Sequence, residues 1–426
     1  MIEFRRPAAG LLSGRGERSD FGQRSRAAPL QISNLTSAII NPLIYLDYNA
    51  TTPLAPEARA AMLPYLTEHY GNPSSIHGAG RATRAAIDDA RDRLAHLLGA
   101  RPHEIIFTAG GTESDNLAIL GLARAHTGRG RHLITAATEH HAVLHAFGHL
   151  ERHENFHVTW LPVDTAGRID PAHLRNAITP ETALVSIMTA NNETGVTQPM
   201  AEISAICRER GVLLHTDAVQ SFGKEPLDTK FYDAVSLAAH KFHGPVGAGI
   251  LWLRSGVSIQ SIQHGGSHEN ERRPGTENVA AIAGMAAAAE IALDSMETEQ
   301  PRQAALRERL WHGVREAFPA AVRNGEPGSQ LSNTLNVSFP GLDGEALLIN
   351  LDLEGICASS GSACMVGSIV PSHVLTAMGR TPELAQATVR FSLGKWTTAD
   401  EIERTIAALP AIMARLRQTD DPPIPA

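Results

Sequence analysis

Cysteine is scarce in this chain, whose 426 residues include only three: Cys207, Cys357 and Cys364. Three cysteines cannot form a disulfide framework, and their spacing fits no common zinc pattern, so we expect no metal site. A basic surplus is also missing, because the formal net charge is −8, which argues against a general nucleic-acid or anionic-membrane binder. No run approaches the roughly 20 apolar residues of a membrane span. These absences indicate a reducing, cytoplasmic setting.

The length and the composition favour a globular protein of two domains. A chain of 426 residues is too long for one small core, and its 43% hydrophobic and 19% charged residues are typical of globular proteins. Residues 1–42 are Arg-rich and lack both apolar periodicity and the apolar region of a secretory signal, so we expect a disordered leader. We predict a large domain over 43–295 and a small one over 296–426, which also packs the segment near 43–50.

Apolar, β-rich runs alternate with helical patterns through the large domain. Seven such runs begin at Glu104, His132, His157, Ala183, Val212, Ala234 and Ala248. Their alternation with helices predicts the α/β class, with a mostly parallel sheet of about seven strands. An Ala-rich helix over Val279–Leu293 and a separate polar helix from Glu299 are expected next. The remaining strands and helices predict a smaller α+β domain, whose last helix begins at a capping box of Thr398 and Glu401.

Polar residues follow several of the predicted strands. Gly110 and Gly111 form a turn before a helix that begins near Thr112, and a helix N-terminus with free N–H groups is a natural phosphate cradle. Asp217 ends an apolar strand, where ligands usually bind in open α/β sheets. A buried carboxylate there needs a cationic partner, such as a protonated pyridine nitrogen. Glycine turns and helix-capping aspartates are mostly structural, so neither signal is specific alone.

A lysine and two further polar residues add to this picture. Lys241 follows a strand and His240 and precedes a Gly-Pro-x-Gly turn, which places it on a loop. Lysine forms Schiff bases when a partly desolvated, cation-rich site lowers its pKa, although most lysines are merely solvated. Asn192 could donate to a phenolate oxygen, and His140 could stack on a flat ring or simply be a satisfied polar residue. Together with Asp217, these residues favour one site for a phosphorylated pyridine.

On these motifs the chain resembles the cysteine desulfurases of the NifS/IscS type, within the class V aminotransferase group of fold-type I pyridoxal-phosphate enzymes. The similarity runs from Tyr45 through Thr398, which is nearly all of the chain apart from its two ends. The matching stretches are YLDYNATTP, GNPSSIHGAG, TAGGTESDNLAI, EHHAV, NNETG, TDAVQSFGK, AAHKFHGP, RRPGTENV, ASSGSAC and PSHVL. Taken together, these stretches are highly specific.

The resemblance implies a role for each site residue. Lys241 would hold pyridoxal 5'-phosphate covalently, and Asp217 would pair with its pyridine nitrogen. The remaining cofactor contacts would be made by Gln220 and Asn192 at the phenolic oxygen, by His140 on the ring face, and by Gly111, Thr112 and His240 at the phosphate.

Other implied roles concern the substrate and a second subunit. Arg390 would bind the substrate carboxylate, because a bidentate arginine–carboxylate pair orients a substrate well, and Asn192 would also face the substrate. His140 would take part in catalysis as well as in stacking. Thr276 would reach the phosphate bound by the partner subunit, which implies a homodimer with shared active sites.

Cys364 distinguishes between the reactions that this fold supports, because the fold alone does not name one. It lies in a Ser/Gly-rich segment that suggests a mobile loop, whereas Cys207 and Cys357 are expected to be buried and inert. By the resemblance, the Cys364 thiolate attacks the sulfur of L-cysteine while Lys241 removes the Cα proton. The products would be L-alanine and a persulfide for an unidentified sulfur-acceptor protein, in iron–sulfur or other thio-cofactor assembly.

The chain departs from the family pattern at three places. Ala238 stands three residues before Lys241, where relatives have a hydroxyl that donates to the phosphate, so we expect weaker cofactor binding. The loop after Cys364 is more apolar than in relatives, and the C-terminal tail does not resemble a scaffold-docking tail. A selenocysteine lyase or aminotransferase on the same fold remains an alternative, as does a non-catalytic scaffold.

Overall fold

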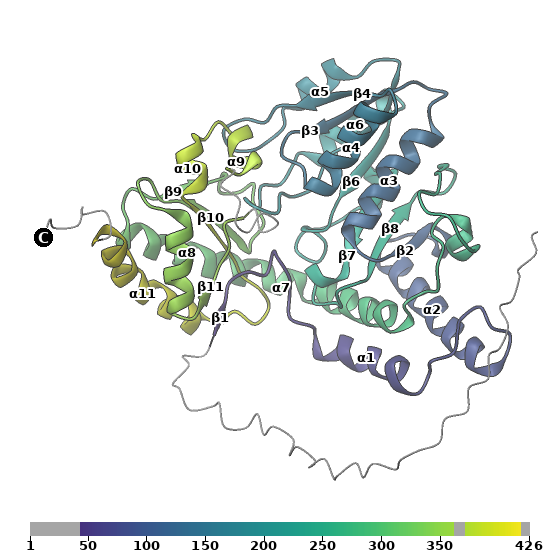
Figure 1. Cartoon of the computed structure of the whole chain (residues 1–426), viewed down its shortest axis with the longest axis horizontal. Helices are drawn as coiled ribbons and strands as arrows, with labels where there is room; N and C mark the ends of the chain where they lie inside the picture. The colour runs from purple at the N-terminus through teal and green to yellow at the C-terminus, as the bar shows by residue number, and fades with distance from the viewer. Residues whose placement is uncertain (1–42, 362–370, 419–426) are drawn as a thin grey trace, which may run out of the picture. The chain divides into compact units, whose positions relative to one another are not determined.

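The computed structural model describes residues 43–361 and 371–418 (Figure 1). Its largest sheet has seven strands in the order β2-β8-β7-β6-β5-β3-β4. β8 runs antiparallel to β2 and β7, and the other neighbouring pairs are parallel. The strands are β2 (Ile105–Thr108), β3 (His132–Ala136), β4 (His157–Leu161), β5 (Thr182–Ser186), β6 (Leu213–Asp217), β7 (Ala234–Ala238) and β8 (Gly249–Leu253). The predicted mostly parallel sheet of seven strands is confirmed.

Helices cover both faces of this sheet, which explains why its strands are apolar on both sides. Ile105 and Phe107 of β2 pack in one core cluster, whereas Ile106 between them packs in another. The first cluster includes residues of α1 (Pro56–Thr67), α2 (Gly78–Leu97), α5 (Pro171–Ala177) and α6 (Met200–Glu209). The second includes residues of α3 (Gly111–Ala125) and α4 (His141–His153). The two faces of the sheet therefore hold two separate apolar layers.

A third core cluster surrounds two smaller sheets. One has the order β12-β10-β9, and in the other β1 pairs in parallel with β11. Their strands are β1 (Ile44–Tyr45), β9 (Val322–Asn324), β10 (Thr334–Ser338), β11 (Ile356–Cys357) and β12 (Thr388–Ser392). The helices of this part are α8 (Gly344–Leu353), α9 (His373–Ala377), α10 (Pro382–Gln386) and α11 (Ala399–Gln418). The predicted capping box precedes α11, since the Glu401 N–H donates to Thr398 Oγ1 (3.2 Å) and the Thr398 N–H donates to Glu401 Oε2 (2.7 Å).

The prediction of two helices around residue 296 was wrong, because a single helix, α7, runs over Val279–Ala317 with Pro301 inside it. Its first half packs in the first cluster and against α1 and α2, whereas Leu310 and Val314 pack in the third cluster. The change of composition along α7 thus reflects two different packing partners. An 18-residue window of α7 is apolar enough to cross a membrane, but 56% of that window is buried inside the protein. This burial accounts for its apolar character.

Candidate active site

The C-terminal ends of β5, β6 and β7 face a cavity of about 330 Å³, a size typical of small-molecule sites. Nine of the eleven predicted site residues line this cavity: Gly111, Thr112, His140, Asn192, Asp217, Gln220, His240, Lys241 and Arg390. Ala238 lines it as well. The fold therefore brings together residues that are spread over nearly 280 positions of the sequence.

Lys241 lies at the end of a 3-10 turn that follows β7 (η4, Ala239–Lys241). Its Nζ donates to the carbonyl oxygens of Asn49 and Ala50, both at 2.7 Å. Asn49 is itself fixed, since its side chain donates to Thr334 Oγ1 (2.9 Å) and accepts from Asn333 Nδ2 (3.0 Å). The amine is thus held at the cavity by a segment far away in the sequence.

Asp217 is the last residue of β6 and belongs to a group of titratable side chains that lie close together. Its Oδ1 accepts the N–H of Val219 (2.8 Å), and burial raises its pKa to about 6. One ligand atom each of Asp217, Asp115 and His140 lie within 4.8 Å of one another. Burial and the charge of Asp217 raise the pKa of Asp115 well above its usual value. A cation brought beside Asp217 would be strongly stabilised, which fits a protonated ring nitrogen.

The N-terminus of α3, which was predicted to cradle a phosphate, opens at the cavity. Its N-cap residue, Gly110, has no side chain with which to cap the helix, and Gly111 and Thr112 open its first turn at the cavity. A Cβ atom at Gly111 would lie 2.8 Å from Val219 Cγ2 and 3.5 Å from Ala238 Cβ. Only glycine therefore allows the helix end to approach the Asp217 loop so closely. Free backbone N–H groups at such a helix end suit a phosphate.

His140 is the N-cap of α4, where its Nδ1 accepts the N–H of Ala142 (3.1 Å). Burial, together with the charge of Lys241, lowers its pKa to about 4. His240 is affected by the same two causes, which lower its pKa to about 4 as well. Both imidazoles are therefore neutral near pH 7. A neutral, flat His140 ring in the wall of the cavity fits a role in stacking on an aromatic ligand.

Arg390 of β12 is almost completely buried, with 2% of its surface exposed. Its Nη2 pairs with Asp47 Oδ1 (2.6 Å), and its Nη1 donates to the carbonyl oxygen of Asn192 (2.9 Å). Among the described residues no acceptor is found for its Nε. Arg390 thus lines the cavity with Asp47 as its counter-ion, while its Nε has no acceptor among the described residues.

The segment that carries Cys364 lies outside the described residues, but the residues on either side of it line the cavity. Gly361 accepts a hydrogen bond from Arg390 Nη1 (3.3 Å). On the other side, His373 lines the cavity, and its ring nitrogen lies 2.9 Å from the carbonyl oxygen of Glu139. Ser372 donates to the buried carboxylate of Glu193 (2.5 Å). The described residues on both sides of this segment therefore lie at the cavity.

The other two cysteines differ from each other. Cys207 in α6 is buried, as predicted, and burial raises its pKa to about 12. Cys357 was expected to be buried but is only partly so, because β11 pairs with the short strand β1 at the edge of the third core cluster. Burial raises its pKa too. Neither thiol is prone to ionise near pH 7.

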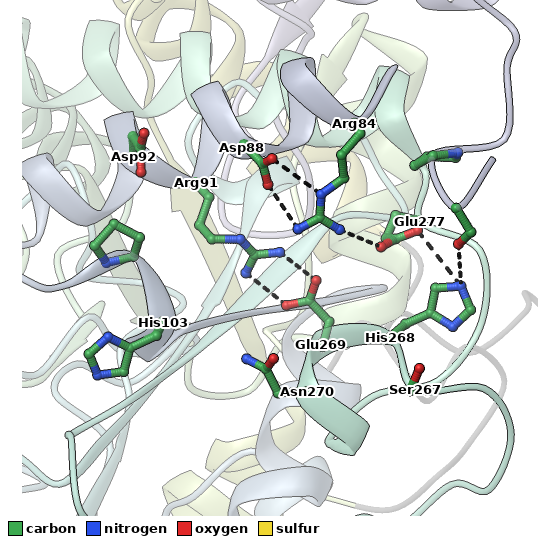
Figure 2. A pocket seen from close by; sticks show the side chains of 13 residues that line it. Arg84, Asp88, Arg91, Asp92, His103, Ser267, His268, Glu269, Asn270 and Glu277 are labelled. Carbon is green, nitrogen blue, oxygen red and sulfur yellow. Dashed lines mark hydrogen bonds and ion pairs between the residues drawn. The ribbon is translucent and has the colours of Figure 1, made fainter. Parts of the chain in front are cut away.

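Thr276 does not line the cavity but is exposed, on the segment that leads into α7. Upstream of it, Glu269, Asn270 and Glu271 have φ of 50°, 54° and 64°, a left-handed run that is costly for residues other than glycine. Figure 2 shows Arg91 of α2 facing Glu269 at a second cavity of about 460 Å³, with Nη1–Oε2 at 2.9 Å and Nη2–Oε1 at 2.5 Å. This buried pair stabilises the unusual course of the segment.

Several contributors to the site were not predicted from the sequence. Asn49 and Ala50 anchor Lys241, Asp47 faces Arg390, and Asp115 lies beside Asp217. A signal was available for the first three, since YLDYNATTP was among the matching stretches without any role assigned to it. Asp115 is within another matching stretch, on the buried side of α3.

The chain is similar to known proteins over most of its length. Residues 44–405 match the model of the aminotransferase class-V family. The chain is similar to "Cysteine desulfurase IscS" of Methanosarcina thermophila, with 47% identity covering 88% of this chain and 93% of that protein. It is also similar to "Cysteine desulfurase" of Homo sapiens, with 42% identity covering 95% and 90%.

Solved structures give the same result. A "NIFS-like protein" superposes with a TM-score of 0.83 at 37% identity, covering 88% of this chain and all of that one. "SspA in complex with cysteine" superposes with a TM-score of 0.73 at 35% identity, covering 83% of this chain and all of that one. Residues 44–405, which match the family model, include the whole seven-stranded sheet and every residue that lines the cavity. The chain therefore belongs to the class-V aminotransferase family, among its cysteine desulfurases.

Proposed function

We propose that this protein is a pyridoxal-phosphate-dependent cysteine desulfurase, which converts L-cysteine to L-alanine and transfers the sulfur to Cys364. The observation that carries the proposal is the cavity itself, where Lys241, Asp217 and the α3 N-terminus meet beside both ends of the Cys364 segment. Relatives that are 42% to 47% identical over most of their length bear this activity in their names.

Each part of the cofactor would have its own partner in the cavity. Lys241 would hold it covalently, Asp217 would pair with the ring nitrogen, and His140 would lie on the ring face. The α3 N-terminus with Gly111 and Thr112, together with His240, would bind the phosphate, and Gln220 and Asn192 would contact the phenolic oxygen. When bound, pyridoxal phosphate supplies an electron sink that makes the substrate Cα proton acidic.

The chain's own residues would carry the remaining steps. Arg390 would orient the substrate carboxylate, and Lys241 Nζ would accept the Cα proton. The Cys364 thiolate would form a bond to the substrate sulfur as the carbon–sulfur bond breaks, and the electron pair of that bond would stay with the carbon. Protonation of this carbon and return of a proton from Lys241 Nζ to Cα would release alanine, leaving a persulfide on Cys364.

The wider setting follows from the same residues. Thr276 is exposed on a segment that Arg91 holds at Glu269, and this position suits a contact with the cofactor phosphate of a second subunit, so we infer a homodimer with shared sites. We retain 43–295 as the cofactor domain and 296–426 as the domain that carries Cys364. A sulfur-acceptor protein would receive the persulfide sulfur for iron–sulfur or other thio-cofactor assembly, in the cytoplasm.

The proposal is tested with purified protein, pyridoxal phosphate, L-cysteine and a thiol reductant. Alanine and sulfide are expected to form in equal amounts. If the protein shows the visible absorbance of lysine-bound cofactor but leaves L-cysteine unchanged, the substrate is a different amino acid, such as selenocysteine. If that absorbance is missing as well, the chain is a non-catalytic member of the fold.

Ala238→Ser is expected to tighten cofactor binding by about tenfold, because a serine hydroxyl at this position can donate to the phosphate. Ala238 is buried at the end of β7 and lines the cavity next to Gly111. The dissociation constant of pyridoxal phosphate is measured by titrating the apoprotein and following the visible absorbance. Ala60→Ser, exposed on α1, is the control. An unchanged affinity in Ala238→Ser would refute the expectation.

A further inference from the structure

Gln220 lies between two polar groups. One of them donates a hydrogen bond to its side-chain amide, and the other accepts a hydrogen bond from it. It is 4% exposed and lines the cavity. Lys224 Nζ donates to its Oε1 (3.2 Å), and its Nε2 donates to the carbonyl oxygen of Asn49 (3.0 Å). That same carbonyl oxygen also accepts from Lys241 Nζ at 2.7 Å. Four residues are thus linked in one chain of hydrogen bonds beside the cavity.

The orientation of the Gln220 amide follows from the chemistry of its two partners. In its charged form Lys224 can only donate, and it then requires the amide oxygen to face it. A backbone carbonyl can only accept, so the atom that faces Asn49 must be the nitrogen. Both partners require the same orientation, and Nε2 carries a second N–H that is left to the cavity.

Asn49 and Lys224 are both anchored, so neither partner can easily follow a rotation of the amide. The Asn49 N–H donates to Ser392 Oγ (2.9 Å), in addition to its side-chain contacts. The Lys224 carbonyl oxygen accepts from Gln300 Nε2 of α7 (2.5 Å). Gly223, before Lys224, has φ of 73°, and a Cβ there would lie 2.7 Å from Ala292 Cβ. The turn that carries Lys224 therefore fits tightly against α7.

The charge of Lys224 is costly where it lies. Within the described ranges, no carboxylate forms an ion pair with its Nζ, and both Lys241 and Glu299 line the same small cavity of about 40 Å³. Burial and the charges of Lys241 and Arg390 lower its pKa to about 7. A lysine in such surroundings is poorly explained by stability, because a partly buried ammonium without a paired carboxylate contributes little to it.

We propose that Lys224 is a positioning residue, which holds the amide oxygen of Gln220 so that an N–H of Gln220 faces the phenolic oxygen of the cofactor. The inference rests on the proposed function, since it assumes a bound pyridoxal phosphate. The proposal concerns which group of the Gln220 amide, the N–H or the oxygen, faces the cavity. With Lys224 in place, two partners hold the amide so that an N–H faces the anionic oxygen. Without Lys224 only the Asn49 carbonyl does so, and the orientation that turns the amide oxygen towards that anion becomes less unfavourable.

The test is a double-mutant cycle read as the dissociation constant of pyridoxal phosphate, with the melting temperature of each apoprotein as a check of folding. Lys224→Met is expected to weaken binding about fivefold in the otherwise unchanged protein and less than about twofold in Gln220→Ala. Lys224→Gln retains an N–H donor and is expected to restore most of the affinity. Lys230→Met, at an exposed position, is the control.

Equal weakening in both backgrounds would mean that Lys224 acts through its charge alone and would overturn the proposal, as would no weakening in either. A second variant does not depend on replacing Lys224. Gln220→Glu keeps the shape but presents oxygen to the cavity, so binding is expected to fall more than about tenfold. Wild-type affinity in Gln220→Glu would also overturn the proposal. A wild-type protein that binds no pyridoxal phosphate would instead contradict the proposed function.

Discussion

Lys241→Ala is expected to lose all measurable release of alanine and sulfide from L-cysteine, a fall of more than about 10⁴-fold. The amine of Lys241 is held at the cavity by the carbonyl oxygens of Asn49 and Ala50. It is proposed both to bind the cofactor covalently and to accept the Cα proton, and alanine can do neither. Both products are quantified, and the visible absorbance of lysine-bound cofactor is expected to be absent.

The control for this variant is Lys230→Ala, an exposed lysine close in sequence. It should retain wild-type activity and absorbance. Activity in Lys241→Ala above about one per cent of wild type would show that another group removes the proton. Retention of the lysine-bound absorbance would show that a different lysine holds the cofactor, and the assignment of the site would then be wrong.

Cys364→Ser is expected to form neither product while binding pyridoxal phosphate as tightly as the wild type. A serine hydroxyl is not ionised near pH 7 and cannot attack sulfur as a thiolate does, so activity should fall by more than about 10³-fold. The assay is run beside the wild type with a thiol reductant, and alanine and sulfide are both quantified. Unchanged cofactor absorbance separates loss of the acceptor thiol from loss of the site.

Cys357→Ser is the matched control, because it removes a thiol that is only partly buried and whose pKa is raised by burial. It should keep wild-type activity. If Cys364→Ser and the wild type release sulfide equally, Cys364 is not the sulfur acceptor, and direct elimination of sulfide from the substrate becomes the better mechanism. If Cys357→Ser is inactive instead, the acceptor has been assigned to the wrong thiol.

The parts of the fold that could be predicted are those whose signal is local. Each strand of the seven-stranded sheet is a short apolar run, because helices cover both of its faces, and such runs are visible in the sequence. Lys241, Asp217 and Gly111 could be predicted for the same reason, since each lies at the end of a strand or within three residues of it. The fold then brings these strand ends together, so the position of each residue at a strand end is enough to place it in the site.

Features that depend on distant contacts could not be predicted. The pairing of Asp47 with Arg390 joins positions 343 residues apart, and no local pattern indicates it. The continuity of α7 was missed because its composition changes where its packing partner changes, and because Pro301 indicates a helix start as readily as an interior position. The contact of Lys224 with Gln220 is local in sequence, but its meaning depends on the distant carbonyl of Asn49.

The single helix α7 has a consequence for how the protein unfolds. Its 39 residues span about 58 Å at 1.5 Å per residue, and its two halves belong to two hydrophobic cores. Helix formation is cooperative, so melting of one core frays its own half of α7 and shortens the helix on which the other core packs. The two cores are therefore coupled in free energy, and the part that carries the cofactor lysine and the part that carries Arg390 lose their order together.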